Sequence, residues 1–368
     1  MRVQSPTWHA ARMKRSTMRR TADNLLHPVA LYESIYANEP RTFAIPLTAE
    51  PVEWEPWRVA FRSALRDRLG GFPSQQTAIR YRAASPTRHP GYQRQYIEYE
   101  SAPGVTVPAW LLIPEGRTRA GPAVIAVHGH GYGMDELVGI NLDGSERAEP
   151  QGYHQDFALA LCRRGMVVLA PELRAFGRRR ERKDQDSGPT SSSCTETAWW
   201  GIMLGKPLLG SRVWDVLQAI GLLQRLPEVD GQRIGIMGGS GGGAVTLFAA
   251  ALETRLRAAV ISNYFCTFRD SILAIQHCAC NYVPGLLEDA EMYDIAALIA
   301  PRPLLVQAGT EDPIFPLQGV LKAYERVHEA YIAQGAAGRI EKDVFVGGHQ
   351  MSGVKAYDFL RYWLSIEP

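Results

Sequence analysis

The sequence predicts an α/β fold, with a mostly parallel central sheet flanked by helices and a helical N-terminal extension. Short apolar segments typical of buried strands alternate with helix-forming segments over most of the 368 residues, and this alternation is typical of parallel sheets with crossover helices. Two alternating segments joined at Pro103 and Gly104 come first and predict an antiparallel hairpin. Ligands of such sheets bind at the carboxyl ends of the strands, so we expect the functional site there.

The elements follow from local patterns along the chain. Residues 92–100 and 105–113 alternate, whereas the later strand segments are apolar throughout, as strands buried on both faces are. Helices are predicted where apolar residues recur three or four positions apart. The expected strands are residues 92–100, 105–113, 123–127, 166–170, 233–237, 258–261, 303–308 and 340–346, and the expected helices are residues 60–69, 153–161, 212–226, 244–252, 317–331 and 351–366.

The N-terminal part and one internal segment do not follow the alternation. We expect residues 1–23 to form a disordered tail, residues 24–90 a helical extension and residues 91–368 the main domain. Residues 172–211 interrupt the main domain and are expected to form an insertion, because a structureless connection of this length is unusual unless it is functional.

Composition excludes several classes of protein. With 46% hydrophobic and 21% charged residues and a formal net charge of +2, the chain shows no sign of a nucleic-acid or membrane partner. No apolar run has the length of a membrane span, and the basic residues 1–20 lack the apolar core of a secretory signal. Five cysteines without framework spacing are typical of a reducing compartment, so we expect a cytoplasmic protein. The sequence does not indicate an oligomeric state.

Two stretches resemble cofactor sites, and we reject both. His277, Cys278 and Cys280 are of metal-ligating types, but such sites need a second pair of ligands and the sequence reveals none. Residues 129–133 resemble a dinucleotide-binding loop, but the third glycine is misplaced and no strand with an acidic end follows at the usual spacing. The sequence therefore predicts neither a metal nor a cofactor.

Residues 238–242 fit the pattern G-x-S-x-G, with Ser240 at its centre. In this motif the serine lies on a sharp turn between a strand and a helix, which exposes its hydroxyl group at the edge of the sheet. The alternative is a glycine-rich connection that only permits close packing. Because an apolar strand precedes the motif and an apolar helix follows it, we interpret Ser240 as a nucleophile.

A nucleophilic serine requires a base and a group that orients the base. The expected chain order is serine, acid and histidine. Asp312 follows the strand at residues 303–308 and is the leading candidate for the acid, with Glu311 as the alternative; an aspartate before proline is also common in plain turns. His349 lies between the last strand and the last helix, whereas His328 has the spacing of a packing residue on a helix.

An oxyanion hole requires two N–H donors. One is expected from Gly241, which follows the nucleophile, and the other from the loop after the strand at residues 123–127. We assign the second donor to the backbone of His130 and expect its side chain to shape the loop.

These motifs identify a family resemblance. The chain from about residue 24 to its end resembles the α/β-hydrolase superfamily, and within it the dienelactone-hydrolase-like and acetyl xylan esterase-like branch. The resemblance rests on residues 128–131, 238–242, 280–285, 309–313 and 348–349. It implies the α/β-hydrolase fold and a serine carboxylesterase that works through an acyl-enzyme. We expect its substrate to be a small-molecule ester, either an acetylated sugar or another small ester. Dienelactone hydrolases have cysteine in place of Ser240, and cephalosporin-deacetylating acetyl xylan esterases usually have glutamine in place of Gly241.

Trp199, Trp200 and Tyr132 are the candidate residues of the substrate pocket. The two tryptophans either pack on the helix that begins at residue 212 or cover the pocket, where they limit acyl length or stack on a sugar ring. The basic run at residues 178–183 is interpreted as a solvated loop rather than a carboxylate clamp. A peptidase or amidase on the same fold and a non-catalytic binding protein are the alternative functions.

Overall fold

The computed structural model describes residues 27–48, 51–73 and 79–365, so the predicted disordered tail lies outside the described residues. The chain divides into two compact units, Met1–Pro40 and Arg41–Pro368. The described part of the first unit contains helix α1 (Pro28–Asn38). The predicted boundary at residue 90 stays a prediction. A search of the described helices finds none with the length and apolar character needed to cross a membrane.

The second unit is built on a 10-stranded sheet in the order β1-β3-β4-β6-β5-β7-β8-β9-β10, with β2 paired to β3. Pairing is parallel from β6 to β10 and antiparallel from β1 to β6, which confirms the predicted mostly parallel sheet with its hairpin. The strands are β1 (Tyr81–Ala83), β2 (Thr87–His89), β3 (Tyr92–Ala102), β4 (Val105–Pro114), β5 (Gly121–Val127), β6 (Val167–Pro171), β7 (Val229–Gly239), β8 (Leu256–Ser262), β9 (Leu304–Gly309) and β10 (Ile340–Phe345).

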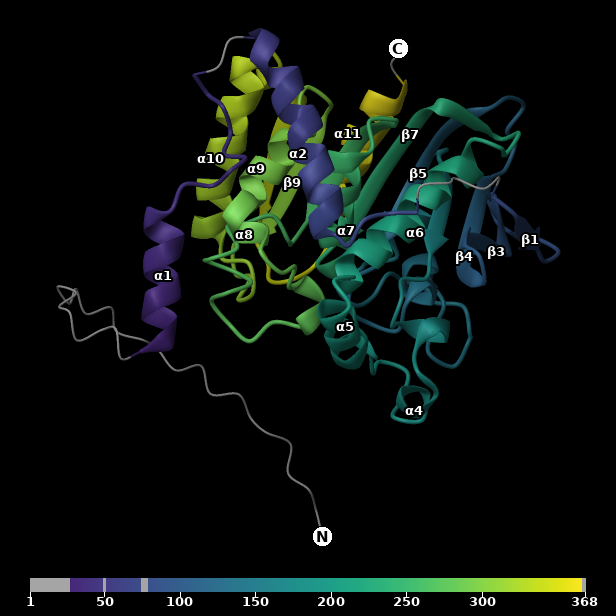
Figure 1. Cartoon of the computed structure of the whole chain (residues 1–368). Coiled ribbons are helices and arrows are strands. Elements are labelled where there is room, and N and C mark those ends of the chain that lie inside the picture. The colour runs from purple at the N-terminus through teal and green to yellow at the C-terminus, as the bar shows by residue number, and fades with distance from the viewer. Residues whose placement is uncertain (1–26, 49–50, 74–78, 366–368) are drawn as a thin grey trace. The chain divides into compact units, whose positions relative to one another are not determined.

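Helices cover both faces of this sheet (Figure 1). In β5, Ile125 and Val127 belong to one hydrophobic core and Val124 and Ala126 to the other, as the two-residue period of a strand requires. The first core includes residues of α2 (Trp54–Arg68), α6 (Leu208–Leu223), α7 (Gly241–Leu252), α9 (Met292–Ala297) and α10 (Leu317–Ala333), and the second includes residues of α3 (Phe157–Cys162) and α11 (Gly353–Ser365).

One predicted helix is wrong in detail. Tyr153 lies outside α3, because Gln155 and Asp156 have φ angles of 51° and 46° and a right-handed helix cannot continue through them. The predicted insertion at residues 172–211 contains regular structure. It contains α4 (Arg182–Gln185), α5 (Cys194–Met203) and the start of α6, together with the short turn η4 (Gly177–Arg179).

Candidate active site

Ser240 occupies the turn between β7 and α7, with φ 53° and ψ −122°. This conformation is strained for any residue with a side chain, and such strain concentrates at functional sites. Its backbone N–H donates to the carbonyl oxygen of Ser262 at 2.9 Å, which ties the turn to β8. A Cβ atom at Gly242 would collide with the carbonyl oxygen of Val127, so only glycine permits the helix to start this close to β5.

The predicted acid and base are hydrogen-bonded to each other. His349 Nδ1 lies 2.8 Å from Asp312 Oδ2, and the Asp312 side chain is only 1% exposed. Asp312 Oδ1 accepts from the N–H groups of Ile314 and Phe315 at 2.8 and 3.1 Å, which fixes the carboxylate after β9. Since a carboxylate can only accept, His349 Nδ1 carries the proton and Nε2 is free to receive another.

The loop that carries His349 lies against the turn that carries Ser240. The N–H of Met351, two residues after His349, donates to the carbonyl oxygen of Tyr153 at 2.7 Å. A Cβ atom at Gly239 would collide with the sulfur of Met351, so this loop and the residue before Ser240 are in direct contact. The structure therefore brings the predicted base to the edge of the sheet where the serine is exposed.

The loop after β5 also touches this turn. A Cβ atom at Gly129 would lie 2.6 Å from the carbonyl oxygen of Gly239 and 3.2 Å from the nitrogen of Gly241. The N–H of Gly129 already donates to His154 Nε2 at 2.9 Å. In the described part of the chain, the N–H groups of His130 and Gly241 have no hydrogen-bond acceptor. These two neighbouring donors are those that the sequence predicts for an oxyanion hole.

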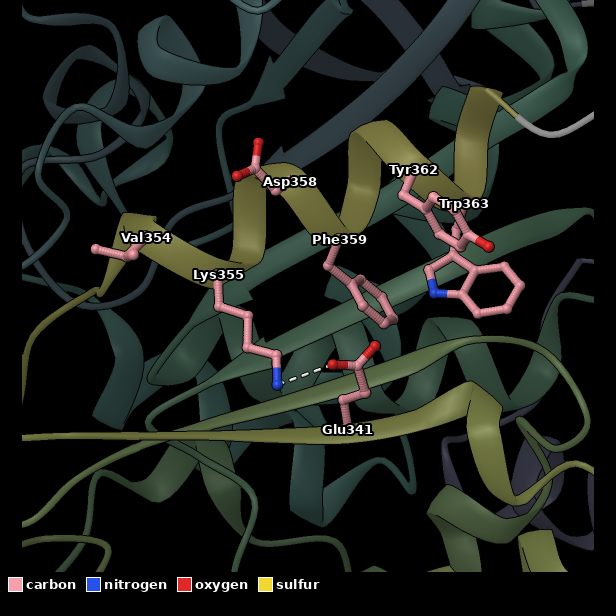
Figure 2. Close-up of a pocket in the computed structure, with 7 residues that line it drawn as sticks. All are labelled: Glu341, Val354, Lys355, Asp358, Phe359, Tyr362 and Trp363. Atoms are coloured by element: carbon pink, nitrogen blue, oxygen red, sulfur yellow. Dashed lines mark ion pairs between the residues drawn. The ribbon is translucent and has the colours of Figure 1, made fainter.

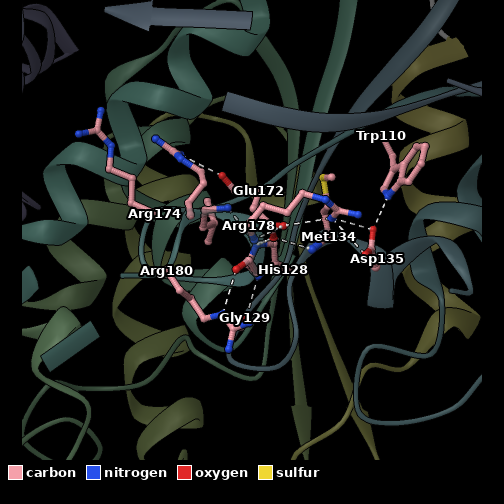
Figure 3. A network of polar contacts seen from close by, with 12 residues as sticks. Trp110, His128, Gly129, Met134, Asp135, Glu172, Arg174, Arg178 and Arg180 are labelled. Atoms are coloured by element: carbon pink, nitrogen blue, oxygen red, sulfur yellow. Dashed lines mark hydrogen bonds and ion pairs between the residues drawn. The ribbon is translucent and has the colours of Figure 1, made fainter. Parts of the chain in front are cut away.

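Buried polar groups hold this loop in place (Figure 3). His128 Nε2 accepts from the N–H of Leu173 at 2.9 Å, so Nε2 lacks a proton and Nδ1 donates to the carbonyl oxygen of Gly129 at 2.8 Å. The fully buried Glu172 accepts from the N–H of Met134 at 2.8 Å. The start of the insertion thus anchors both ends of the loop that carries His130.

The basic run at residues 178–183 is only partly a solvated loop: Arg182 and Lys183 are exposed, as the sequence interpretation expects, but Arg178 and Arg179 form ion pairs with the protein. Arg178 pairs with Asp135 at 3.1 Å, and Figure 3 shows Arg178 reaching across the network toward it. Arg179 pairs with the buried Asp215 at 2.8 Å. Sequence reasoning missed these pairs because their acidic partners lie more than thirty positions away in the chain.

Asp215 is the centre of an ion-pair network at the base of the insertion. It is 1% exposed, and its Oδ2 lies 2.7 Å from Arg174 Nε and 2.8 Å from Arg179 Nη1. Burial alone would raise the pKa of Asp215, but the hydrogen bonds and positive charges of Arg174 and Arg179 outweigh burial and lower it. The carboxylate is therefore charged and paired in the folded protein.

Replacing Asp215 with alanine is expected to lower the free energy of unfolding by about 3–5 kcal/mol, because two arginines lose their buried partner. Folding lowers the pKa of Asp215 from its unfolded value of about 4. The charged carboxylate therefore stabilises the folded protein above about pH 4, and this stabilisation is lost as the pH falls below that value. Urea titration at pH 7 measures the change. Glu329→Ala, which breaks an exposed pair with Arg326, is the control and should cost below about 1 kcal/mol; equal effects of the two variants would contradict the prediction.

A cluster of sulfur and imidazole groups lies beside the same loop. The ligand-type atoms of His130, Cys194, Cys278 and Cys280 all lie within 4.8 Å of one another. Burial alone would lower the pKa of His130, but contacts with Cys194 and Cys280 raise it to about 9. The sequence marked His277, Cys278 and Cys280 as ligand types and rejected a metal site because no second pair of ligands was evident. His277 lies outside the cluster, and its other two members gave no signal because three segments far apart in the chain form it.

The candidate substrate residues have different surroundings. Tyr132 donates its hydroxyl hydrogen to the carbonyl oxygen of Ile140 at 2.9 Å and lines a cavity of about 460 Å³ together with Arg147. Trp199 and Trp200 are 63% and 66% exposed on α5, so most of each indole faces solvent. Neither tryptophan lines this cavity or the one described next.

A second cavity, of about 380 Å³, lies between β10 and α11 (Figure 2). Phe359 and Trp363 contribute apolar surface to it, and Lys355 pairs with Glu341 at 2.8 Å across it. Ser240, Asp312 and His349 do not line it. It is therefore separate from the candidate active site.

The strand order and the strained serine turn define the class of this protein, a serine hydrolase with the α/β-hydrolase fold. The model of the acetyl xylan esterase (AXE1) family matches residues 87–283, more than half of the chain. The chain belongs to this family and is an esterase. The matched segment includes Ser240 and ends before Asp312 and His349.

Individual proteins resemble this chain in sequence or in fold. The chain is 29% identical to the protein YtaP of Bacillus subtilis (strain 168) over 266 residues, which cover 70% of this chain and 83% of YtaP. The solved structure of protein BF1801 from Bacteroides fragilis NCTC 9343 matches with a TM-score of 0.73 at 17% identity, covering 91% of this chain and 89% of that one. A glucuronoyl esterase from Solibacter usitatus matches with a TM-score of 0.63 at 14% identity, covering 88% and 96%. At these identities the two structures show a shared fold alone.

Proposed function

We propose that this esterase removes acetyl groups from acylated sugars through an acyl-enzyme, with Ser240 as nucleophile, His349 as base and Asp312 as the group that orients His349. The proposal rests above all on the 2.8 Å hydrogen bond between His349 Nδ1 and Asp312 Oδ2, beside the strained turn of Ser240. The Asp312 carboxylate holds the His349 proton on Nδ1. Nε2 is thereby available to take the proton of the serine hydroxyl.

The reaction has two balanced halves. Ser240 Oγ attacks the ester carbonyl carbon while its proton passes to His349 Nε2, and the N–H groups of Gly241 and His130 stabilise the negative oxygen. The C–O bond to the sugar then breaks, and the sugar oxygen takes the proton from His349. A water molecule next attacks the acetyl-serine, His349 removes its proton and returns it to Ser240, and acetate leaves.

The family description supports the proposed substrate, and the five free cysteines support the proposed compartment. The family takes its name from esterases of acetylated xylan, a polysaccharide. The cysteines at positions 162, 194, 266, 278 and 280 form no disulfide in the described structure, as is typical of proteins in a reducing compartment. We therefore place the esterase in the cytoplasm, acting on acetylated sugars of a size that can enter the cell.

A substrate panel tests the function. We expect p-nitrophenyl acetate and acetylated xylo-oligosaccharides to be hydrolysed, and aminoacyl p-nitroanilides to be left intact. Faster cleavage of the anilides would indicate a peptidase or amidase. If the protein hydrolysed a methyl glucuronate ester faster than acetyl esters, its substrate would be a uronic acid ester and not an acetylated sugar. A folded protein that cleaves none of them would be a binding protein.

We further propose that Trp199 and Trp200 contact the sugar, because two exposed indoles on one helix offer flat apolar surfaces for stacking. Trp199→Ala and Trp200→Ala should each lower kcat/KM for acetylated xylo-oligosaccharides by roughly three- to tenfold, as expected for one lost aromatic contact. Activity on p-nitrophenyl acetate should stay unchanged, since this substrate has no sugar. Tyr362→Ala, which removes a 59% exposed aromatic side chain from α11, is the matched control. If both tryptophan variants hydrolysed the oligosaccharides at the wild-type kcat/KM, the proposal that α5 contacts the sugar would be wrong.

A further inference from the structure

Four side chains that commonly bind metals point at one common space beside α5. His130 Nε2 lies 3.8 Å from Cys280 Sγ and 4.0 Å from Cys194 Sγ, and the sulfurs of Cys278 and Cys280 are 3.2 Å apart. Two donors on a tetrahedral zinc ion lie about 3.8 Å apart for two sulfurs and about 3.6 Å apart for sulfur and nitrogen, given the usual zinc–ligand bond lengths. The observed spacing therefore suits a single ion at the centre of the four groups.

We propose that His130, Cys194, Cys278 and Cys280 bind one zinc ion as a closed Cys₃His site. The four ligands fill a tetrahedral shell and leave no position for water or substrate, which is the mark of a structural zinc site rather than a catalytic one. Cys194 and Cys280 are buried, and His130 and Cys278 are partly buried. The site is thus shielded from bulk water and needs no exposed ligand.

The charges around the cluster support this assignment. Three thiolates and a divalent cation leave one negative charge, and burying it requires a compensating cation. Arg212 supplies that cation, because it is 1% exposed and its Nη2 lies 3.0 Å from Cys194 Sγ. Arg212 is itself fixed by the carbonyl oxygen of Arg174, at 3.0 and 2.8 Å. Asn281 Nδ2 lies 3.8 Å from Cys280 Sγ, and such outer N–H donors orient the ligands of metal sites.

A disulfide between two of these cysteines explains less of the arrangement. A bond between Cys278 and Cys280 would use two sulfurs and leave Cys194 and His130 aimed at a bridge they cannot join. A metal ion uses all four groups at once.

The zinc would connect three segments that are distant in the sequence. His130 follows β5, and Cys194 is the first residue of α5. Cys278 directly precedes the short 3-10 helix η5 (Ala279–Asn281), and Cys280 lies within it. The ion would therefore fasten the insertion at residues 172–211 and the segment after β8 to the loop that carries His130. The metal assignment itself does not depend on the proposed function, because none of the four side chains belongs to the Ser240, His349 and Asp312 set.

Metal analysis of the full chain tests the proposal. The protein is produced without a polyhistidine tag in zinc-supplemented medium, kept reduced, and measured by elemental analysis and native mass spectrometry. We expect about one zinc per chain. Cys194→Ser and Cys280→Ser should each lower the zinc content by roughly tenfold or more. Cys266→Ser is the matched control, since Cys266 is also buried but lies outside the cluster, and it should retain the metal.

Cobalt binding provides a second measurement. It uses the wild-type chain, so it does not require that a cysteine variant folds. The wild-type chain, stripped of metal with a chelator and given Co²⁺, should show the thiolate charge-transfer and visible bands of a tetrahedral cobalt site. A reduced, folded wild-type protein that binds neither zinc nor cobalt would overturn the proposal. A metal-free protein with a disulfide among these cysteines would overturn it too, as would equal zinc content in Cys280→Ser and Cys266→Ser. Neither metal measurement uses esterase activity, so failure here is distinguishable from failure of the proposed reaction.

Discussion

Replacing Ser240 with alanine should lower kcat for acetyl esters by about 10⁶-fold, the size of the loss when a serine nucleophile is removed from a complete triad. The variant keeps the strained turn, because alanine needs no more room than serine at a φ of 53°. A residual rate of about 10³–10⁴ over the uncatalysed reaction should persist, since the two proposed oxyanion donors are backbone N–H groups that the substitution leaves in place. Steady-state kinetics with p-nitrophenyl acetate measure kcat, and a thermal unfolding curve shows whether the variant keeps its fold.

The control for this variant is Ser187→Ala, which removes an exposed serine hydroxyl in the insertion. It should retain the wild-type rate and the wild-type unfolding temperature. If Ser240→Ala kept kcat within tenfold of the wild type, the nucleophile would have to be another residue.

Asp312→Asn should lower kcat by about 10⁴-fold while the protein remains folded. An asparagine can present an N–H group to His349 Nδ1, which favours the tautomer with its proton on Nε2. The ring then cannot accept the proton of Ser240, although every side chain keeps its place.

Glu311→Gln is the matched control, because Glu311 is adjacent in the chain and was the alternative acid. The structure gives His349 a hydrogen bond to Asp312 and none to Glu311 among the described residues. Glu311→Gln should therefore change kcat less than about tenfold. A large loss in Glu311→Gln with normal kcat in Asp312→Asn would reverse the assignment.

Much of the fold could be predicted because its signals are local. The strand ending at Gly239 and the helix starting at Gly241 are each visible as a continuous apolar segment, and the motif around Ser240 lies between them. The positions of Asp312 and His349 after the last two strands followed from chain order. Parallel strands bring their carboxyl ends to one edge, so order along the chain translated into proximity in space.

The features that were missed depend on contacts between distant segments. The sequence marked Cys278 and Cys280 as ligand types but could not show that His130 and Cys194 meet them, because spacing along the chain carries no information on how an insertion folds back. The same limit hid the carboxylate partner of Arg179, Asp215, on a later helix. The late start of α3 depends on left-handed backbone at Gln155, a residue type without strong preference for it.

Covalent labelling tests the central claim, that Ser240 is the nucleophile of this esterase, most directly. The full chain is incubated with a fluorophosphonate, digested, and the modified residue is identified by tandem mass spectrometry. We predict one label per chain, on Ser240, with loss of esterase activity in proportion to labelling, and no label in Ser240→Ala. Stoichiometric labelling of a different residue, or full esterase activity in a chain labelled at Ser240, would contradict the account.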